Sequence, residues 1–178
     1  MQPPISKITF AVMGSGSDEH LDLAEPIGAL IAALGCNLLT GAGNGVMKAV
    51  SRAYARCRRA RGVCIGIVPC ADIDHRSSPA QGYPNEFVEL PIFTHLPFSG
   101  KKGEHDLSRN HINILSSDAI VALPGGDGTA SEVNLAVKYK APIIAFGKNT
   151  AALANFHRGV VRVHRIEDVE SFLRQHLA

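Results

Sequence analysis

The sequence predicts an α/β fold: one doubly wound, Rossmann-like domain over residues 1–178, with a mostly parallel six- or seven-stranded sheet and helices on both faces. Three observations lead to this expectation. Short apolar runs alternate with longer segments of helical periodicity, as is typical of parallel strands covered on both faces. Glycine-rich loops follow several of these runs. The length of 178 residues fits one domain, and no repeat or linker divides it.

The first half of the chain contains three strands and two helices in alternation. Each expected strand is nearly all apolar, and each expected helix carries apolar residues at helical spacing. The expected elements are a strand at 8–14, a helix at about 19–34, a strand at 37–41, a helix at 46–57 and a strand at 62–69.

The second half begins with a long polar loop at 70–85, and a second loop follows at 94–106. Loops of this length in a compact domain are usually functional or mobile, so we expect both to take part in function. The remaining expected elements are a strand at 87–93, a helix at 107–115, a strand at 118–124, a helix to about 140, a strand at 141–147, a short strand at 160–164 and a last helix at 166–177.

Composition narrows the class of protein. Apolar residues make up 46% and charged residues 19%, and the formal charge of +2 is too small to indicate a nucleic-acid partner. No apolar run is long enough to span a membrane and no signal peptide is evident, so we expect a cytoplasmic protein with no membrane partner. Five arginines crowd together and are expected to form a solvated helix face and end: Arg52, Arg56, Arg58, Arg59 and Arg61.

Cysteine and histidine give little sign of a metal site. The four cysteines, at 36, 57, 64 and 70, form no C-x-x-C pair, so reduced structural thiols are expected. His105 and His111 lie in the region of the candidate site, but no H-E-x-x-H motif is present. We therefore expect no metal and no required cofactor.

Three glycine loops follow expected strands: GSGSDE at 14–19, GAGNGV at 41–46 and PGGDGT at 124–129. None is a P-loop or a complete dinucleotide fingerprint. At one rim of a parallel sheet, however, their backbone N–H groups and the following helix N-termini favour an anion, so a phosphate-bearing ligand is expected. The candidate binding residues are Gly14, Ser15, Gly43, Asn44, Gly45, Pro124, Gly125, Gly126, Asp127, Gly128 and Thr129. Asp127 is expected to point away from a bound phosphate.

Glu132 allows two interpretations. Thr129 to Glu132 has the T-x-x-E spacing of a capping box, in which each side chain satisfies the other residue's backbone N–H. Alternatively, Glu132 faces the ligand as a functional carboxylate. The local sequence does not decide between them.

The motif P-G-G-x-G-T-x-x-E, complete here from Pro124 to Glu132, resembles that of the Lonely Guy-type cytokinin-activating phosphoribohydrolases, long mislabelled as lysine decarboxylases. The arginine of that family's R-K pair corresponds to Arg109, but Asn110 replaces the lysine. The stretch SRNHINILSS is also similar to molybdenum-cofactor carrier proteins, a branch of the same fold that binds a phosphate-bearing pterin without hydrolysing it.

The first resemblance implies hydrolysis of AMP, or of an N6-modified AMP, to free base and ribose 5-phosphate. Glu132 would then stabilise positive charge on the ribose or orient water, and Arg109 would position Glu132 or contact the phosphate. Asn113, one turn after Arg109, could face the same site. The alternative is a non-catalytic nucleotide or molybdenum-cofactor carrier. Lysine decarboxylation is rejected, because no pyridoxal-phosphate constellation is present.

The same resemblance implies a homodimer or a larger homo-oligomer. The candidate interface helices are those at 46–59 and from 107 onward.

Overall fold

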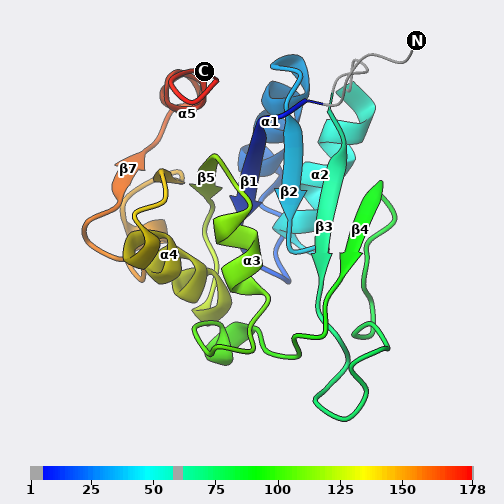
Figure 1. Ribbon diagram of the computed structural model, residues 1–178. Helices are drawn as coiled ribbons and strands as arrows, with labels where there is room; N and C mark the ends of the chain where they lie inside the picture. The colour runs from blue at the N-terminus through cyan, green and yellow to red at the C-terminus, as the bar shows by residue number, and fades with distance from the viewer. Residues whose placement is uncertain (1–5, 58–61, 178) are drawn as a thin grey trace.

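The computed structural model describes residues 6–57 and 62–177. Within them, seven strands form one sheet in the order β4-β3-β2-β1-β5-β6-β7, and every neighbouring pair is parallel (Figure 1). The predicted fold class is therefore confirmed, with the sheet parallel throughout. The strands are β1 (Thr9–Met13), β2 (Asn37–Thr40), β3 (Cys64–Val68), β4 (Leu90–Phe93), β5 (Ala119–Ala122), β6 (Ile143–Phe146) and β7 (Val161–Val163).

The helices cover the sheet from both sides (Figure 1). Helices α1, α2 and α5 share one hydrophobic core with one face of the sheet, whereas α3 and α4 share a second core with the other face. The helices are α1 (Leu21–Ala33), α2 (Val46–Cys57), α3 (Asn110–Leu115), α4 (Asp127–Tyr139) and α5 (Ile166–Arg174), with short 3-10 turns η1 (Gly100–Lys102) and η2 (Ala151–Leu153).

Strand β1 shows why the sheet is buried on both faces. Phe10 and Val12 pack into the core beneath α1 and α2, while Ala11 and Met13 pack into the core beneath α3 and α4. Alternate side chains of a strand point to opposite faces, so a strand between two helical layers must be apolar at every position.

The sheet reverses its direction of growth beside β1. The chain places β2, β3 and β4 on one side of β1 and then returns to place β5 on the other side. The loops after β1 and β5 therefore leave adjacent strand ends, at the switch point where ligands bind in doubly wound folds.

Several elements are shorter than expected. The fourth strand begins at Leu90 rather than at 87, and α3 begins at Asn110 rather than at 107. Among the described residues, no helix has the length and apolar character needed to cross a bilayer, and no cluster of three or more metal-binding side chains occurs.

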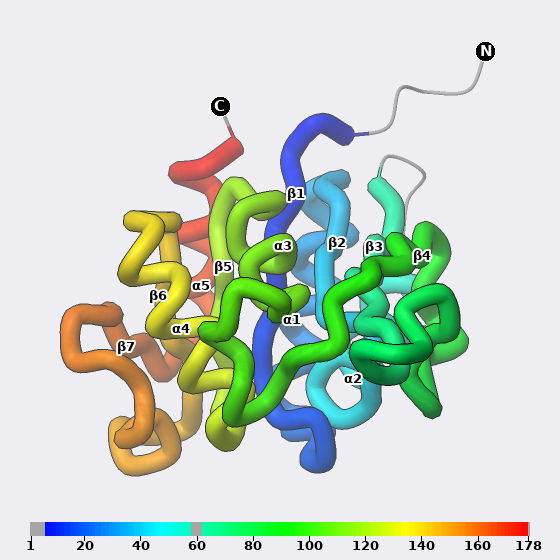
Figure 2. Tube along the Cα trace, turned by 60° about the horizontal axis from the view of Figure 1, so that its bottom comes forward, coloured from blue at the N-terminus to red at the C-terminus, as the bar shows by residue number. Residues whose placement is uncertain are grey.

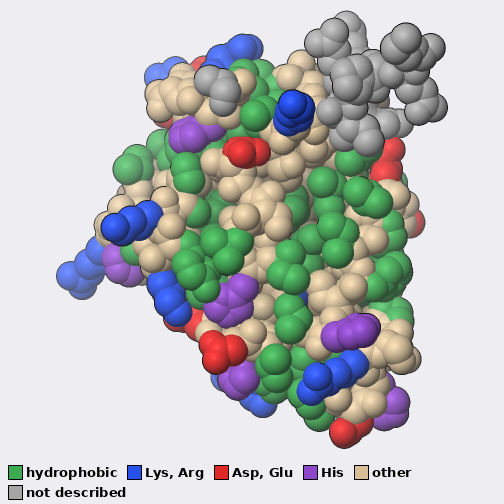
Figure 3. Space-filling model, in the orientation of Figure 1, with side chains coloured by type: hydrophobic (Ala, Val, Ile, Leu, Met, Phe, Trp, Pro, Cys, Tyr) green, Lys and Arg blue, Asp and Glu red, His purple; other side chains and the backbone are tan. Residues whose placement is uncertain are grey.

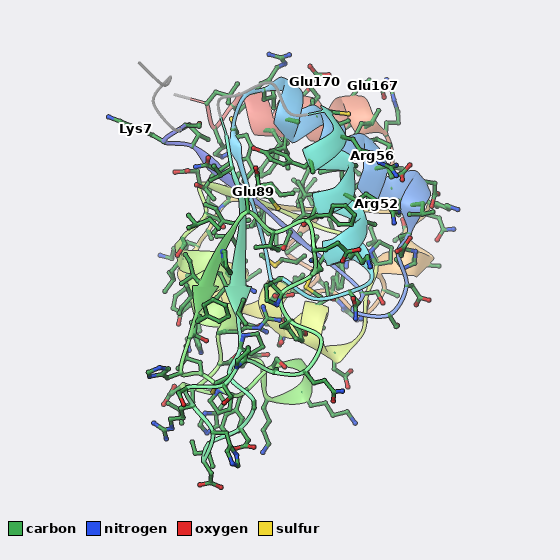
Figure 4. The ribbon with its side chains drawn as sticks, turned by 90° about the vertical axis from the view of Figure 1, so that its right-hand side faces the viewer. Lys7, Arg52, Arg56, Glu89, Glu167 and Glu170 are labelled. Carbon is green, nitrogen blue, oxygen red and sulfur yellow. The ribbon has the colours of Figure 1, made fainter. Side chains whose placement is uncertain are left out.

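The arginine-rich helix is partly described. Arg52 and Arg56 come from α2 (Figure 4), and Arg52 lies 3.2 Å from Glu19 and 3.6 Å from Glu25. Arg52 thus joins α2 to the start of α1 and its flanking loop. The predictions for Arg58, Arg59 and Arg61 fall outside the described residues.

The four cysteines are free thiols. Cys36, Cys64 and Cys70 are buried, whereas Cys57 is exposed at the end of α2. Burial raises the pKa of Cys64 to about 11, as expected of an unreactive thiol packed in the core.

Candidate functional site

A cavity of about 370 Å³ opens at the carboxyl ends of the strands, the side of the molecule that comes forward in Figure 2. Its walls come from the loop after β1, from α2, from the two long loops and from the starts of α3 and α4. The lining residues are Met13, Gly14, Ser15, Gly16, Ser17, Met47, Tyr83, Ser99, Gly100, Arg109, Asn110, Gly126, Gly128, Thr129 and Glu132. Segments far apart in the sequence therefore meet at the switch point.

The three glycine loops are bound to one another through Ser15. The Ser15 backbone N–H donates to the carbonyl of Pro124 at 3.1 Å, and the Ser15 carbonyl accepts from the N–H of Val46 at 2.9 Å. Gly125 has no room for a side chain, because a Cβ there would meet Thr129 Oγ1 and lie 2.8 Å from the Ser15 nitrogen. Gly45 has φ +59°, and a Cβ there would collide with the Ser15 carbonyl oxygen. Small residues here allow the three backbones to converge.

The predicted phosphate-binding residues fall into two groups. Those that line the cavity are Gly14, Ser15, Gly126, Gly128 and Thr129. Those outside the lining are Gly43, Asn44, Gly45, Pro124, Gly125 and Asp127. Of the second group, Gly45, Pro124 and Gly125 hold the loops together, Asn44 is exposed, and Gly43 lies beside Met47 and Tyr83. Contact of either group with a ligand stays a prediction.

Asp127 is the first residue of α4 and lies at the rim. Its carboxylate is 3.9 Å from the Lys101 ammonium, and both side chains are largely exposed. A screened surface pair of this kind contributes little stability, and it leaves the Asp127 carboxylate directed at solvent and Lys101 rather than into the cavity lining.

Glu132 does not form the capping box that its spacing allowed. Helix α4 begins at Asp127 with Gly126 as its N-cap, so Thr129 lies inside the first turn and makes no cap hydrogen bond. The Glu132 carboxylate instead accepts a hydrogen bond of 2.9 Å from Asn113 Nδ2 on α3. The carboxylate is thus directed at the cavity and α3, not at the start of its own helix.

Burial governs the protonation of Glu132. The side chain is only 8% exposed, and loss of hydration raises its pKa to about 7, although nearby Arg109 and the hydrogen bond from Asn113 both lower it. Near neutral pH the residue therefore exists in both protonation states, a property characteristic of groups that move protons.

Arg109 brings a buried positive charge to the same cavity. It is 4% exposed, and its Nη1 donates to the carbonyl of Ile67 at the end of β3, 3.0 Å away. Its Nε is buried and has no hydrogen-bond partner among the described residues. A Cβ on Gly41 would collide with the guanidinium. The absence of a side chain at Gly41 therefore leaves the space that the Arg109 guanidinium occupies.

The segment around η1 is attached to α4 and forms part of the cavity wall. Asn134 Nδ2 donates to Glu104 at 2.9 Å, and Ser131 Oγ, which donates to the Gly128 carbonyl at 2.7 Å, lies 3.4 Å from the Gly100 carbonyl oxygen. Asn110 Nδ2 donates to Ser131 Oγ at 3.3 Å and is buried. Asn110, which stands where the Lonely Guy-type motif has lysine, therefore helps to hold this wall together.

The sequence did not reveal several lining residues. Tyr83, Ser99 and Gly100 lie in the two aperiodic loops, and Met47 sits on an otherwise core-facing helix. The only available signal was the expectation that loops 70–85 and 94–106 are functional.

Comparison with known proteins identifies the family of this chain. The family model described as SLOG cluster4 matches residues 7–173. The chain belongs to the SLOG cluster4 family. This family lies within the Lonely Guy-like superfamily, which accounts for the complete P-G-G-x-G-T-x-x-E motif at the cavity.

Two solved structures share the fold of this SLOG cluster4 protein. The molybdenum cofactor binding protein of Rippkaea orientalis is 30% identical with a TM-score of 0.72, and covers 97% of this chain and 99% of its own. The molybdenum cofactor carrier protein of Chlamydomonas reinhardtii is also 30% identical, with a TM-score of 0.70 and the same coverage. An uncharacterized protein of Archaeoglobus fulgidus is 30% identical over 131 residues, 72% of this chain and 73% of its own.

Proposed function

We propose that this SLOG cluster4 protein is a nucleoside 5′-monophosphate phosphoribohydrolase that acts on AMP or an N6-modified AMP. The observation that carries the proposal is the placement of Glu132. Its buried carboxylate, with a pKa of about 7, lies in the same cavity as the N-terminus of α4 and the Arg109 guanidinium.

The start of α4 supplies the anion site of this proposal. The backbone N–H groups of a first helical turn have no partners within the helix, and the helix dipole favours negative charge there. Gly126, Gly128 and Thr129 line the cavity at this turn, and nothing lies within 4 Å of the position that a Cβ on Gly126 would occupy. A 5′-phosphate can therefore approach the backbone closely.

Glu132 lies one turn further along α4, within reach of the ribose of a nucleotide anchored in this way. In the proposed reaction, water adds to C1′, the bond from C1′ to the base nitrogen breaks, and its electron pair leaves with the base. The proton lost by water balances the proton gained by the base. An ionised Glu132 stabilises the oxocarbenium-like transition state and accepts the proton from water. No cofactor enters this scheme.

Arg109 has two capacities in this scheme. Its charge favours the ionised form of Glu132, and its guanidinium belongs to a residue that lines the cavity, where a positive charge attracts a phosphate. Because Nη1 is fixed to the Ile67 carbonyl, the planar guanidinium is held in one orientation before the ligand arrives.

The direct test is incubation of the purified protein with AMP and N6-substituted AMP, followed by chromatography of the products. We expect release of free base by the wild type and a loss of at least 100-fold in Glu132→Ala. Glu170→Gln is the matched control, because this half-buried glutamate of α5 (Figure 4) lies away from the cavity lining and pairs with Arg174. Absence of base release by the wild type, or equal release by Glu132→Ala, would exclude the hydrolase.

A carrier of a phosphate-bearing cofactor is the second candidate. It is favoured by the 30% identity, over nearly the whole chain, to proteins described as binding or carrying molybdenum cofactor. Under this proposal the same helix N-terminus holds the phosphate, but Glu132 transfers no proton. Pterin fluorescence in the purified protein, together with a thermal shift by a pterin phosphate and none by AMP, would favour the carrier.

We also propose that the protein forms a homodimer through an exposed apolar patch, defined by Leu90, Ile92 and Leu115. These side chains are 42–63% exposed, and hydrophobic side chains gather on the face that carries α3 and β4 (Figure 3). Leu115 belongs to the helix predicted from 107, whereas the apolar side of α2 is buried in the core against α1. An exposed edge strand is a template for pairing with another chain, and an exposed apolar patch marks a site of interaction.

Light scattering tests this interface. Ile92→Asp is expected to halve the mass of the assembly, whereas Leu21→Asp, at an exposed leucine on α1, is expected to leave it unchanged. A monomeric wild type, or an unchanged mass in Ile92→Asp, would exclude the patch as the interface.

A further inference from the structure

The cavity has a second wall whose chemistry differs from that of the helix N-terminus. Tyr83 and Met47 both line it, and both lie against the second glycine loop. A Cβ on Gly43 would lie 2.8 Å from Met47 Cε and 2.9 Å from Tyr83 Oη. The aromatic ring and the thioether are therefore neighbours on one surface, which we name the Tyr83–Met47 wall.

Asn85 fixes this wall in place. Its backbone N–H donates to the carbonyl of Ala42 at 2.8 Å, and its Nδ2 donates to the carbonyl of Gly43 at 2.8 Å. The Asn85 side chain is buried. These two bonds attach the end of the long loop to the glycine loop, so Tyr83 is held beside the cavity although it belongs to an aperiodic segment.

Tyr83 lies at the cavity and is not part of the hydrophobic core. Its ring is partly exposed while it lines the cavity, and the Arg109 guanidinium lies 5.5 Å from the ring centroid. The partly exposed ring and the thioether beside it offer dispersion and π contacts, and the guanidinium near the ring adds a cation–π contact. The face of the ring and the thioether suit a flat, conjugated group better than a phosphate or a sugar.

The two walls of the cavity suit different parts of one ligand. The polar wall consists of Ser15, Ser17, Thr129 and the glycines at the start of α4, and it takes the phosphate under the proposed function. The planar part of the same ligand must then pack elsewhere, and the Tyr83–Met47 wall presents the aromatic surface of the cavity lining.

We propose that the Tyr83–Met47 wall is the subsite for the planar heterocycle of the ligand, and that Tyr83 determines the preference for heteroaromatic phosphates over simple sugar phosphates. This inference rests on the proposed phosphate site. A purine base and a pterin share the required chemistry, and the choice of ligands in the experiment separates them.

The experiment is calorimetric binding of AMP, ribose 5-phosphate and a pterin monophosphate to the wild type, Tyr83→Phe and Tyr83→Leu, each carrying Glu132→Gln so that AMP is not hydrolysed during the titration. Ribose 5-phosphate is the control ligand, since it keeps the phosphate and sugar but lacks the heterocycle. Contact of one base with one aromatic side chain corresponds to roughly a 10-fold change in affinity or more. We expect Tyr83→Leu to weaken AMP by about that factor, with ribose 5-phosphate changed less than about 2-fold and Tyr83→Phe close to the wild type.

The outcomes separate the two proposals. Equal weakening of AMP and ribose 5-phosphate in Tyr83→Leu, or no weakening of either, would overturn the role of Tyr83 while leaving the phosphate site intact. Binding of the pterin monophosphate alone, weakened in Tyr83→Leu, would support the wall and exclude the nucleotide hydrolase. A wild type that binds none of the three ligands would overturn both. Thermal melting of each variant, with Tyr83→Asn as a second substitution, confirms that the fold is retained.

Discussion

Replacement of Glu132 by glutamine should stabilise the protein at alkaline pH. The folded protein raises the pKa of this buried carboxyl from its ordinary 4.5 to about 7. Below pH 4.5 the folded and unfolded chains both hold the proton. Between pH 4.5 and 7 the unfolded chain ionises at this position while the folded chain does not, so stability falls as the pH rises. Above pH 7 both forms are ionised, and the loss is complete.

The magnitude follows from the width of that window. One pKa unit corresponds to about 1.4 kcal/mol, so ionised Glu132 lowers the free energy of unfolding by roughly 3 kcal/mol at pH 8, against less than about 1 kcal/mol at pH 5. Glutamine never ionises, and its side-chain oxygen can still accept the hydrogen bond from Asn113. The stability advantage of Glu132→Gln over the wild type should therefore grow by about 2 to 3 kcal/mol between pH 5 and pH 8.

Urea denaturation of both proteins at pH 5 and pH 8 measures this advantage, and other titrating groups cancel in the comparison. Glu170→Gln, at a half-buried carboxylate of α5 paired with Arg174, is the control and should show no such growth. If the difference in free energy of unfolding between Glu132→Gln and the wild type stays constant with pH, the pKa of Glu132 is not raised by burial. Its proposed role in proton transfer near neutral pH would then lose its basis.

Three further variants test other parts of the structure. Gly41→Ala places a Cβ against the Arg109 guanidinium and should weaken AMP binding by roughly 10-fold or more in calorimetry; an unchanged affinity would show that Arg109 is not held in its binding position by this glycine. Asn113→Leu removes a hydrogen bond that lowers the pKa of Glu132, so that pKa, followed by NMR titration, should rise above 7 and not fall. Gly28→Ala forces a Cβ between α1 and α2 and should cost about 1 to 3 kcal/mol in urea denaturation, with ligand affinity unaffected.

Much of the fold was predictable because parallel strands buried on both faces must be apolar throughout. Strand β1 illustrates this, since Phe10 and Ala11 face different cores yet are both fully buried. Such runs stand out from the helical segments between them. The ends of the elements were less predictable: residues 87–89 continue the pattern of β4 without belonging to that strand.

The site was predictable only where it follows from a strand end. The loops after β1 and β5 had to meet at the switch point, and Arg109 was found through a family motif. Tyr83 and Met47 were missed, because they come together through the hydrogen bonds of Asn85 to a distant loop. A loop without periodicity carries no signal of such a contact.

The T-x-x-E spacing shows the limit of local patterns. It corresponds to a capping box only if Thr129 is the N-cap, but α4 begins earlier and takes Gly126 as its N-cap. That start lies where the loop after β5 packs on Ser15, a contact of tertiary structure. The helix register, and hence the direction of Glu132, could not be deduced from the four residues alone.

A crystal structure of Glu132→Gln with bound AMP would show directly where the phosphate and the ribose lie. We expect the phosphate on the backbone N–H groups at the start of α4, C1′ of the ribose next to residue 132, and an intact glycosidic bond. A phosphate bound away from α4, or a ribose out of reach of residue 132, would contradict the proposed hydrolysis.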